Sequence, residues 1–285
     1  MRLFLTWLMF AVLASASAQT AELQLVASAE PQAVFAGSNR VVNLCWQNAG
    51  DTATETQIQS RVMQLTSATA VCVGEAAWKT LQVLPGQTVL ETAALNFPPV
   101  RAKTRFSVQW LDASSNELGA TEVFIYPTNL LAELGVLLNH DENALGVYDP
   151  DNELKPLLKN LKIGFVDLEN AVAENFRGKL AIVGAFSSKA GAKSLATHQI
   201  KTLANNGVAI VWVSPTKNDA IADLDKIQPS FYLVPQGHTA AVIAQPALLA
   251  NLEGNPRAQL NLIRFCKVAL QPALAEQTFS LPQKN

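Results

Sequence analysis

The sequence is poor in the residues that carry most enzymatic and metal chemistry. Its 285 residues include three cysteines, three histidines and three tyrosines, and charged residues make up 15% of the chain. The formal net charge is −2, so the chain has no basic field for nucleic acid and no polybasic patch for a membrane surface. His140, His198 and His238 are far apart, and no His-x-x-x-His or Cys-x-x-Cys pair occurs. We therefore expect no metal site and no cofactor.

Long apolar runs are also missing, except at the beginning of the chain. An apolar run from Leu3 to Leu13 follows Arg2, and Ala16-Ser17-Ala18 supplies the small residues of a cleavage site. This pattern predicts a signal peptide over residues 1–18, cut after Ala18, and a periplasmic or secreted protein. An uncleaved N-terminal anchor is the alternative. Since no other stretch reaches 18 apolar residues, we expect no stable membrane anchor.

Three cysteines in an exported chain predict one disulfide and one leftover thiol. Cys45 and Cys72 are both out of phase with the apolar residues of their strands, which favours a bridge between them on the outer surface. Two free thiols are the alternative. Cys266 lies among apolar residues of a predicted helix, so we expect it to be a small buried hydrophobe.

Residues 19–126 alternate with a period of two. In "RFSVQWL", the side chains of Phe106, Val108 and Trp110 share one face of a strand. Turn signals such as Pro85-Gly86 separate short runs of this kind, which predicts an antiparallel β-sandwich. Trp46 and Trp110 fall in the apolar phase, so we expect them in the core rather than on an aromatic sugar-binding platform.

Two longer stretches of this half carry a resemblance. "PQAVFAGSNRVVNLCWQNAGDTATE" places a Pro and a Gly before an alternating strand that ends in Asn-x-Gly, and "WKTLQVLPGQT" is a strand that ends in Pro-Gly. The region resembles the cell-adhesion-related (CARDB-like) immunoglobulin-like domains of exported bacterial proteins. The resemblance implies an all-β immunoglobulin-like sandwich that acts as a spacer or a binding module.

The period changes in residues 144–272. Strand patterns ("ALGVYDP", "KIGFVDL", "KLAIVGAF" and "VAIVWVSP") alternate with helical ones, which predicts a doubly wound α/β domain with a mostly parallel sheet. Gly207 is expected to cap the helix before "VAIVWVSP", and Asn255 and Pro256 to open the last helix. Residues 127–143 are predicted to be a linker with a possible helix, and residues 273–285 a C-terminal tail.

The order of "KLAIVGAF", "NNGVAIVWVSP" and "GHTAAVIAQPALL" resembles the class I glutamine-amidotransferase-like (flavodoxin-like) fold. The closest form is the non-catalytic version appended to exported bacterial carbohydrate-active enzymes. Active members carry a Gly-x-Cys-x-Gly elbow whose cysteine is the nucleophile. Here Gly184-Ala185-Phe186 places Ala185 at the nucleophile position, Ser187 replaces the second glycine, and His238 precedes a strand instead of following one. The resemblance therefore implies a pseudoenzyme.

Other interpretations of the same stretch fit less well. "KAGAKS" lacks the first glycine of a phosphate loop and has Ala192 between Gly191 and Lys193. A serine hydrolase would use Ser187 or Ser188 with Asp167 and a histidine, His198 or His238, but neither serine lies in Gly-x-Ser-x-Gly. "HDENALGVYDPDNE" lacks the spacing of a calcium loop.

Ligands of open α/β sheets bind beyond the carboxyl ends of the strands. The predicted rim at these ends consists of Asp149, Asp167, Ser187, Ser188 and Ser214. The sequence thus predicts an exported, non-catalytic binding or accessory protein with a glycan, peptide or protein partner. A periplasmic hydrolase with an unrecognised serine site and a structural or assembly subunit are the alternatives.

Overall fold

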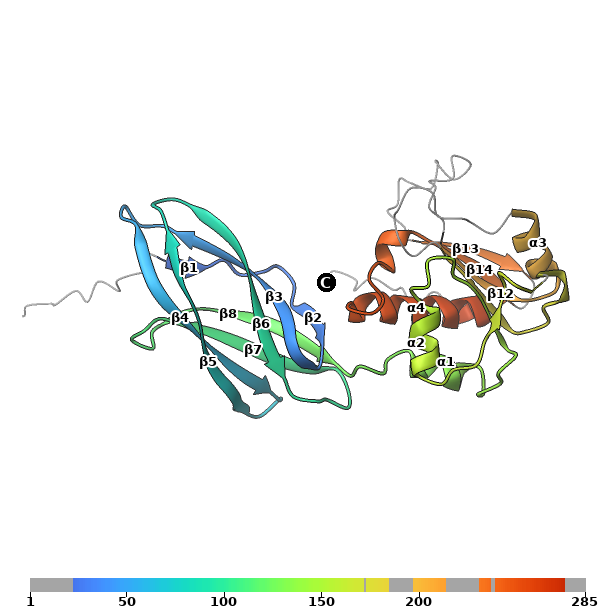
Figure 1. Ribbon diagram of the computed structural model, residues 1–285, viewed down its shortest axis with the longest axis horizontal. Coiled ribbons are helices and arrows are strands. Elements are labelled where there is room, and N and C mark those ends of the chain that lie inside the picture. The colour runs from blue at the N-terminus through green and yellow to red at the C-terminus, as the bar shows by residue number, and fades with distance from the viewer. Residues whose placement is uncertain (1–22, 172, 185–196, 214–230, 237–238, 275–285) are drawn as a thin grey trace, which may run out of the picture.

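The computed structural model describes residues 23–171, 173–184, 197–213, 231–236 and 239–274 (Figure 1). The described chain is rich in β-structure and forms three sheets. Two of them belong to the first half and the third to the second half, so the expectation of a β-rich protein with more than one domain is confirmed. None of the helices in these ranges has the length and apolar character needed to cross a bilayer.

The first half consists of eight strands in two sheets. The strands are β1 (Leu23–Leu25), β2 (Gln32–Phe35), β3 (Gly37–Asn48), β4 (Thr54–Leu65), β5 (Ala70–Val83), β6 (Thr88–Phe97), β7 (Thr104–Leu111) and β8 (Glu117–Tyr126). One sheet has the order β1-β3-β6 and the other the order β2-β8-β7-β4-β5. Their inward side chains form one shared core, so the sheets pack face to face as a sandwich.

The period-two alternation places the core residues as predicted. Phe106, Val108 and Trp110 of β7 are fully buried, and so is Trp46 of β3. The Trp78 ring centroid lies 6.3 Å from that of Trp46 and 5.3 Å from that of Trp110. The three indoles thus form a cluster inside the sandwich, which rules out a surface platform built on Trp46 and Trp110.

Asn48 explains the Asn-x-Gly signal at the end of β3. Its side chain is fully buried, and its Nδ2 donates to the carbonyl oxygens of Thr52 at 2.8 Å and of Val83 at 3.0 Å. Its Oδ1 accepts from the amide of Gly50 at 2.9 Å. Because Val83 belongs to the second sheet, one amide side chain shapes the turn and ties the two sheets together.

The predicted Cys45–Cys72 disulfide is absent, and all three cysteines are free thiols. Cys45 lies on β3 opposite Leu90 of β6, whereas Cys72 lies on β5 opposite Met63 of β4. The two residues therefore belong to different sheets, and neither points into the core that the sheets share. Phase in a strand predicted that both would point outward but could not predict on which sheet each would lie.

The second half contains a six-stranded sheet of order β10-β9-β11-β12-β14-β13. Its strands are β9 (Leu145–Tyr148), β10 (Val166–Asp167), β11 (Leu180–Val183), β12 (Ala209–Val213), β13 (Phe231–Gln236) and β14 (Thr239–Ala244). All neighbours are parallel except the antiparallel pair β13–β14. The strand β11 is buried at every position, as expected for a strand that is covered on both faces.

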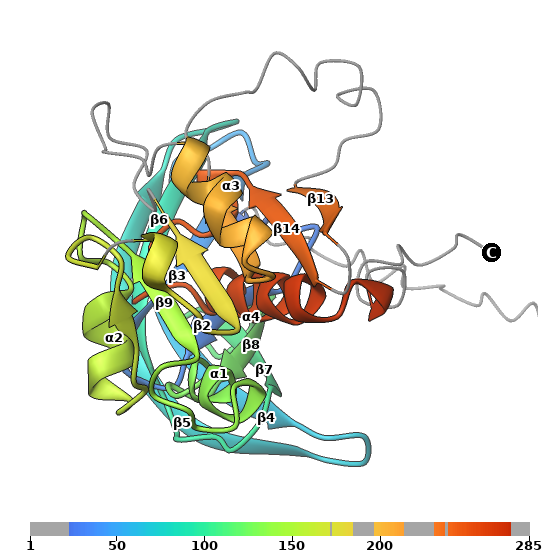
Figure 2. The ribbon, with the colours of Figure 1, turned by 90° about the vertical axis from the view of Figure 1, so that its right-hand side faces the viewer.

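Helices cover both faces of this sheet (Figure 2). One face packs on α1 (Ala132–Leu137), α2 (Lys155–Asn160) and α4 (Pro256–Leu270), and the other on η1 (Ala173–Asn175) and α3 (Thr197–Asn205). The short 3-10 helices η3 (Pro246–Leu248) and η4 (Pro272–Leu274) flank α4. The predicted caps are confirmed: Asn255 accepts from the amides at the start of α4, and Gly207 has φ +77° after α3.

Residues 127–143, expected to be a linker with a possible helix, contain the helix α1, and from Leu131 onward they pack into the second core. Leu131, Leu134 and Leu138 are buried there together with strand residues such as Val147. Their spacing of three and four residues is the apolar stripe of a helix. The α/β unit therefore begins by Leu131 rather than at residue 144.

Candidate functional site

The predicted rim lies where β9 and β10 end. Asp149 follows β9 directly, and Asp167 is the last residue of β10, which pairs in parallel with β9. The structure thus brings these two carboxylates to the same edge of the sheet. Ser187, Ser188 and Ser214 lie outside the described residues, as do Ala185 and His238.

Asp149 serves as an anchor for α2. The residue is fully buried, and its carboxylate accepts hydrogen bonds from the amides of Glu153 at 3.2 Å, Leu154 at 2.8 Å and Lys155 at 2.9 Å. These amides have no partner inside the helix because they belong to its beginning. The carboxylate of Asp149 is thus buried against backbone amides at the start of α2.

Asp167 forms an ion pair with Lys155, a residue that the sequence analysis did not predict at this site. Lys155 is 6% exposed, and its Nζ lies 2.9 Å from Oδ1 of Asp167 and also contacts the carboxylate of Glu169. Glu169 in turn accepts from the amide of Asp149 at 3.4 Å. We call Asp149, Lys155, Asp167 and Glu169 the rim network.

The pKa values of the network keep its charges in place. Burial alone would raise the pKa of Asp167, but the hydrogen bond from Lys155 and further bonds from Glu169 and Asn170 hold it below its usual value. Burial alone would lower the pKa of Lys155, but Glu169 and Asp167 raise it above its usual value. The lysine therefore stays an ammonium ion and cannot act as a general base near neutral pH.

Tyr148 stands beside the network. Its pKa is raised by burial and by the negative charge of Glu169, while Lys155 acts in the opposite direction. The phenol is thus held in its neutral form. Among the described residues, no group of three histidine, cysteine, aspartate or glutamate side chains is arranged to hold a metal ion.

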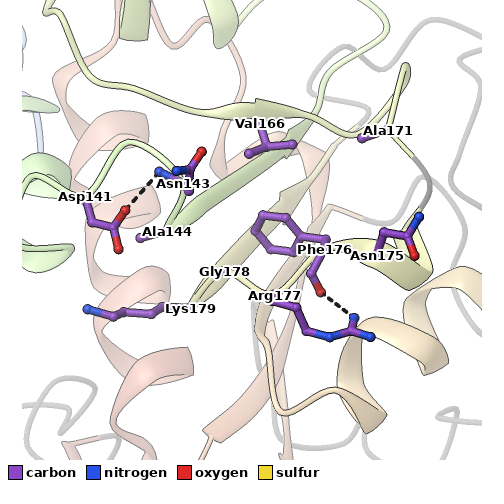
Figure 3. A pocket seen from close by; sticks show the side chains of 10 residues that line it. All are labelled: Asp141, Asn143, Ala144, Val166, Ala171, Asn175, Phe176, Arg177, Gly178 and Lys179. Atoms are coloured by element: carbon purple, nitrogen blue, oxygen red, sulfur yellow. Dashed lines mark hydrogen bonds between the residues drawn. The ribbon is translucent and has the colours of Figure 1, made fainter.

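A cavity of about 470 Å³ lies at the opposite end of the sheet, where β9 and β11 begin (Figure 3). Its lining residues are Asp141, Asn143, Ala144, Val166, Ala171, Asn175, Phe176, Arg177, Gly178 and Lys179. Several of the polar groups are already bonded: Asp141 accepts from the amide of Asn143, and Arg177 donates to the carbonyl oxygens of Phe176 and Glu174. A Cβ atom on Gly178 would overlap the Phe176 ring and lie 2.7 Å from the carbonyl oxygens of Asn143 and Ala144, so close packing requires glycine there.

Comparison with known proteins gives no family assignment. No protein-family model matches the chain, and no curated protein matches it either. Solved structures match only in part. One is the alkylpurine DNA glycosylase AlkC of Pseudomonas fluorescens bound to DNA, at 15% identity and a TM-score of 0.27, covering 37% of this chain and 30% of that one.

Two further structures are similar to a comparable degree. A β-glucosidase of Listeria innocua shares 19% identity at a TM-score of 0.27, covering 37% of this chain and 16% of that one. The CsuC–CsuE chaperone–tip adhesion subunit complex of Acinetobacter baumannii shares 14% identity at a TM-score of 0.24, covering 34% and 54%. This chain thus spans less than a third of the first two proteins, and likenesses this low carry no argument about function.

Proposed function

We propose that the protein is an exported recognition protein without catalytic activity. In this proposal an immunoglobulin-like sandwich is joined to a degenerate amidotransferase-like α/β domain, and the pair binds a glycan, a peptide or a protein. One observation carries the proposal. The acidic side chains that reach the carboxyl edge of the sheet are bonded to the protein's own backbone and to Lys155.

The hydrogen bonds and ion pairs of the rim network hold protein segments together and do not present a catalytic group. A general acid or base needs a pKa near the working pH and a face turned toward substrate. Asp167 has a lowered pKa, Lys155 a raised one, and Asp149 is fully buried against amides. Ala185 at the nucleophile position of the resemblance points in the same direction, because a methyl group cannot attack a carbonyl carbon.

The topology supports the α/β part of the proposal. The strand order places β9 between β10 and β11, with β12 next, so the chain reverses its direction of winding beside β9. This order is that of flavodoxin-like sheets, which bind ligands at the carboxyl ends beside the reversal. In this chain the antiparallel pair β13–β14 completes the sheet.

The first test looks for turnover. Residues 19–285 are incubated with a panel of ester, amide and glycoside substrates and with a fluorophosphonate probe, beside the triple variant Ser187→Ala, Ser188→Ala, Ser214→Ala. We expect no turnover and no labelling above that of the triple variant, and the exposed-turn control Ser114→Ala should behave as the wild type does. Turnover that the triple variant loses and the control keeps would establish a hydrolase and overturn the proposal.

The second test looks for recognition. The same protein is applied to a glycan array and a peptide library, and hits are measured by calorimetry. We expect a saturable ligand for the folded chain that the heat-unfolded chain does not bind. Failure on both arrays, combined with a stable stoichiometric complex in native extract, would instead support an assembly subunit.

A further inference from the structure

The sandwich and the α/β unit meet at a cleft that neither half forms alone. The cleft has a volume of about 350 Å³ and is lined by Glu30, Pro31, Ala33, Lys103, Phe124, Tyr126, Arg257, Leu260, Asn261 and Arg264. The first six belong to the sandwich, and the last four to α4. In Figure 1, α4 points toward the end of the sandwich where β2 lies.

One face of α4 is turned to this cleft. Arg257, Leu260, Asn261 and Arg264 follow the spacing i, i+3, i+4 and i+7, which places them in one stripe along a helix. The opposite side of α4, which includes Leu262 and Cys266, is buried against the sheet. This stripe of four residues can therefore contact the sandwich and a ligand that lies between the two units.

The sandwich contributes an aromatic floor. Phe124 and Tyr126 occupy the outward phase of β8, yet Tyr126 is only 8% exposed. Tyr126, Arg257 and Arg264 line the same cleft, where burial raises the pKa of Tyr126 while the two guanidinium groups act to lower it. Lys103 lies over the Phe124 ring, with its Nζ 3.8 Å from the ring centroid.

Positive charge in the cleft exceeds negative charge. It contains three cationic side chains and one carboxylate, that of Glu30, which accepts from Nη1 of Arg257 at 3.1 Å. Nη2 of Arg257 donates to the carbonyl oxygen of Pro31 at 2.6 Å. Within the described part of the chain, neither Lys103 nor Arg264 forms an ion pair, so two cations face the cleft without a carboxylate.

We propose that this cleft binds the carboxylate of an acidic sugar, held by Arg264 and Lys103 across the two units. The inference deepens the proposed binding function and rests on it. Glu30 shows that a carboxylate fits beside Arg257 at the edge of this cleft, and the guanidinium fork of Arg264 matches carboxylate geometry in the same way. The volume falls in the range of small-molecule sites.

The lining favours a sugar over a peptide. A peptide backbone brings amides and carbonyls that need partners, but Pro31 has no N–H, its carbonyl oxygen is taken by Arg257, and the Asn261 amide nitrogen donates to Leu248. Sugar hydroxyls both donate and accept, so they can use the remaining Asn261 oxygen and the Tyr126 hydroxyl. The apolar edges of Phe124 and Leu260 suit the C–H face of a pyranose ring.

The test uses the mature full-length chain and calorimetric titration with a disaccharide of galacturonic acid. We expect binding that weakens as salt rises, that is absent for the dimethyl ester of the same sugar, and that falls about tenfold or more in Arg264→Ala and Lys103→Ala. Arg264→Lys should restore part of it, which separates lost charge from lost folding. Lys201→Ala, the same loss of charge on α3, should bind as wild type does.

Each other outcome overturns the inference. Undiminished binding in both variants would place the sugar elsewhere, no binding would exclude an acidic sugar, and preferential binding of an aspartate dipeptide would make the ligand a peptide. The proposed function is judged separately. If a neutral ligand bound equally well to the wild type and to Arg264→Ala, the protein would still be a recognition protein, but this cleft would not be its binding site. If turnover depended on the rim residues, the proposed function would be wrong even if the cleft bound the acidic sugar.

Discussion

The two halves of the molecule keep their charges in different places. In the sandwich, strands alternate and ion pairs such as Arg61–Glu75 stay on the surface, while the core contains indoles and aliphatic side chains. In the α/β unit, strands such as β11 are apolar on both faces, and a lysine and two acids are drawn in at the end of the sheet. A sheet with one solvent-exposed face can keep its charged side chains on that face. A sheet that is covered on both faces must place charged side chains at the ends of its strands. There they either take part in chemistry or pair with other groups of the protein.

The largest effect should come from the indole cluster. Trp110→Ala removes a fully buried side chain and its hydrogen bond to Thr121, so the sandwich should lose about 3–5 kcal/mol of its free energy of unfolding. Denaturant unfolding with a tryptophan-fluorescence and a far-UV readout should show that the α/β transition is unchanged. Leu203→Ala, in the α/β core, should destabilise the α/β unit and leave the transition of the sandwich unchanged. If both variants shifted both transitions equally, the halves would be one cooperative unit.

Removing the rim lysine should destabilise only the α/β unit. Lys155→Met leaves Asp167 and Glu169 without their cation, which should cost about 2–3 kcal/mol near neutral pH. Lys159→Met, on the same short helix but exposed, is the control and should change little.

The pH dependence of that difference follows from the two shifted pKa values. The lowered pKa of Asp167 gives stability that is present above 3.8 and is lost as pH falls through the folded-state value. The raised pKa of Lys155 gives stability that is present below 10.5 and is lost as pH rises through its folded-state value. The wild type and Lys155→Met should therefore differ most between these limits. A difference that did not change at low pH would contradict an ionised pair.

A smaller effect is expected at the start of α4. Asn255→Ala removes the acceptor for the amides of Arg257 and Ala258, which should cost about 1 kcal/mol in the α/β transition. Asn255→Asp should recover most of the loss, since a carboxylate also accepts from these amides. No recovery would mean that Asn255 contributes through its bond to Ala250 instead.

The smallest effect on stability is expected at Cys72. The side chain is exposed and free, so Cys72→Ser should change the free energy of unfolding by less than about 0.5 kcal/mol. A thiol reagent should label Cys72 rapidly without prior reduction. It should reach Cys266 only on unfolding, because that residue is buried and burial raises its pKa. If Cys72 required a reductant, the disulfide expected from the sequence would exist after all.

Sequence predicted those features that depend on neighbours along the chain. Alternation found the buried residues of β7, and Asn255 with Pro256 found the start of α4. The spacing of Leu131, Leu134 and Leu138 was an available signal for a core helix, but the stretch was interpreted as a linker with a possible helix. Pairings across the fold were beyond reach: the Lys155–Glu169 contact and the sheet assignment of Cys72 depend on how distant segments meet.

The residues of the cleft could be recognised in the sequence one by one, but their meeting in space could not be predicted. The stripe of Arg257, Asn261 and Arg264 on α4 was visible in the sequence, as was an outward-phase tyrosine at the end of β8. Each is ordinary alone, because surface helices have polar faces and strands have outward residues. Only the fold shows that the two surfaces face one another.

The short connection between the halves has a consequence for the cleft. Only residues 127–130 separate Tyr126, at the end of β8, from Leu131 in the second core. Such a segment reaches roughly 14 Å when fully extended. A connection this short keeps the two walls of the cleft near each other, so each wall meets the other at a high effective concentration. A ligand held between them would gain affinity from this tether without any additional contact, and would lose it if the connection were lengthened with a flexible glycine-serine insert.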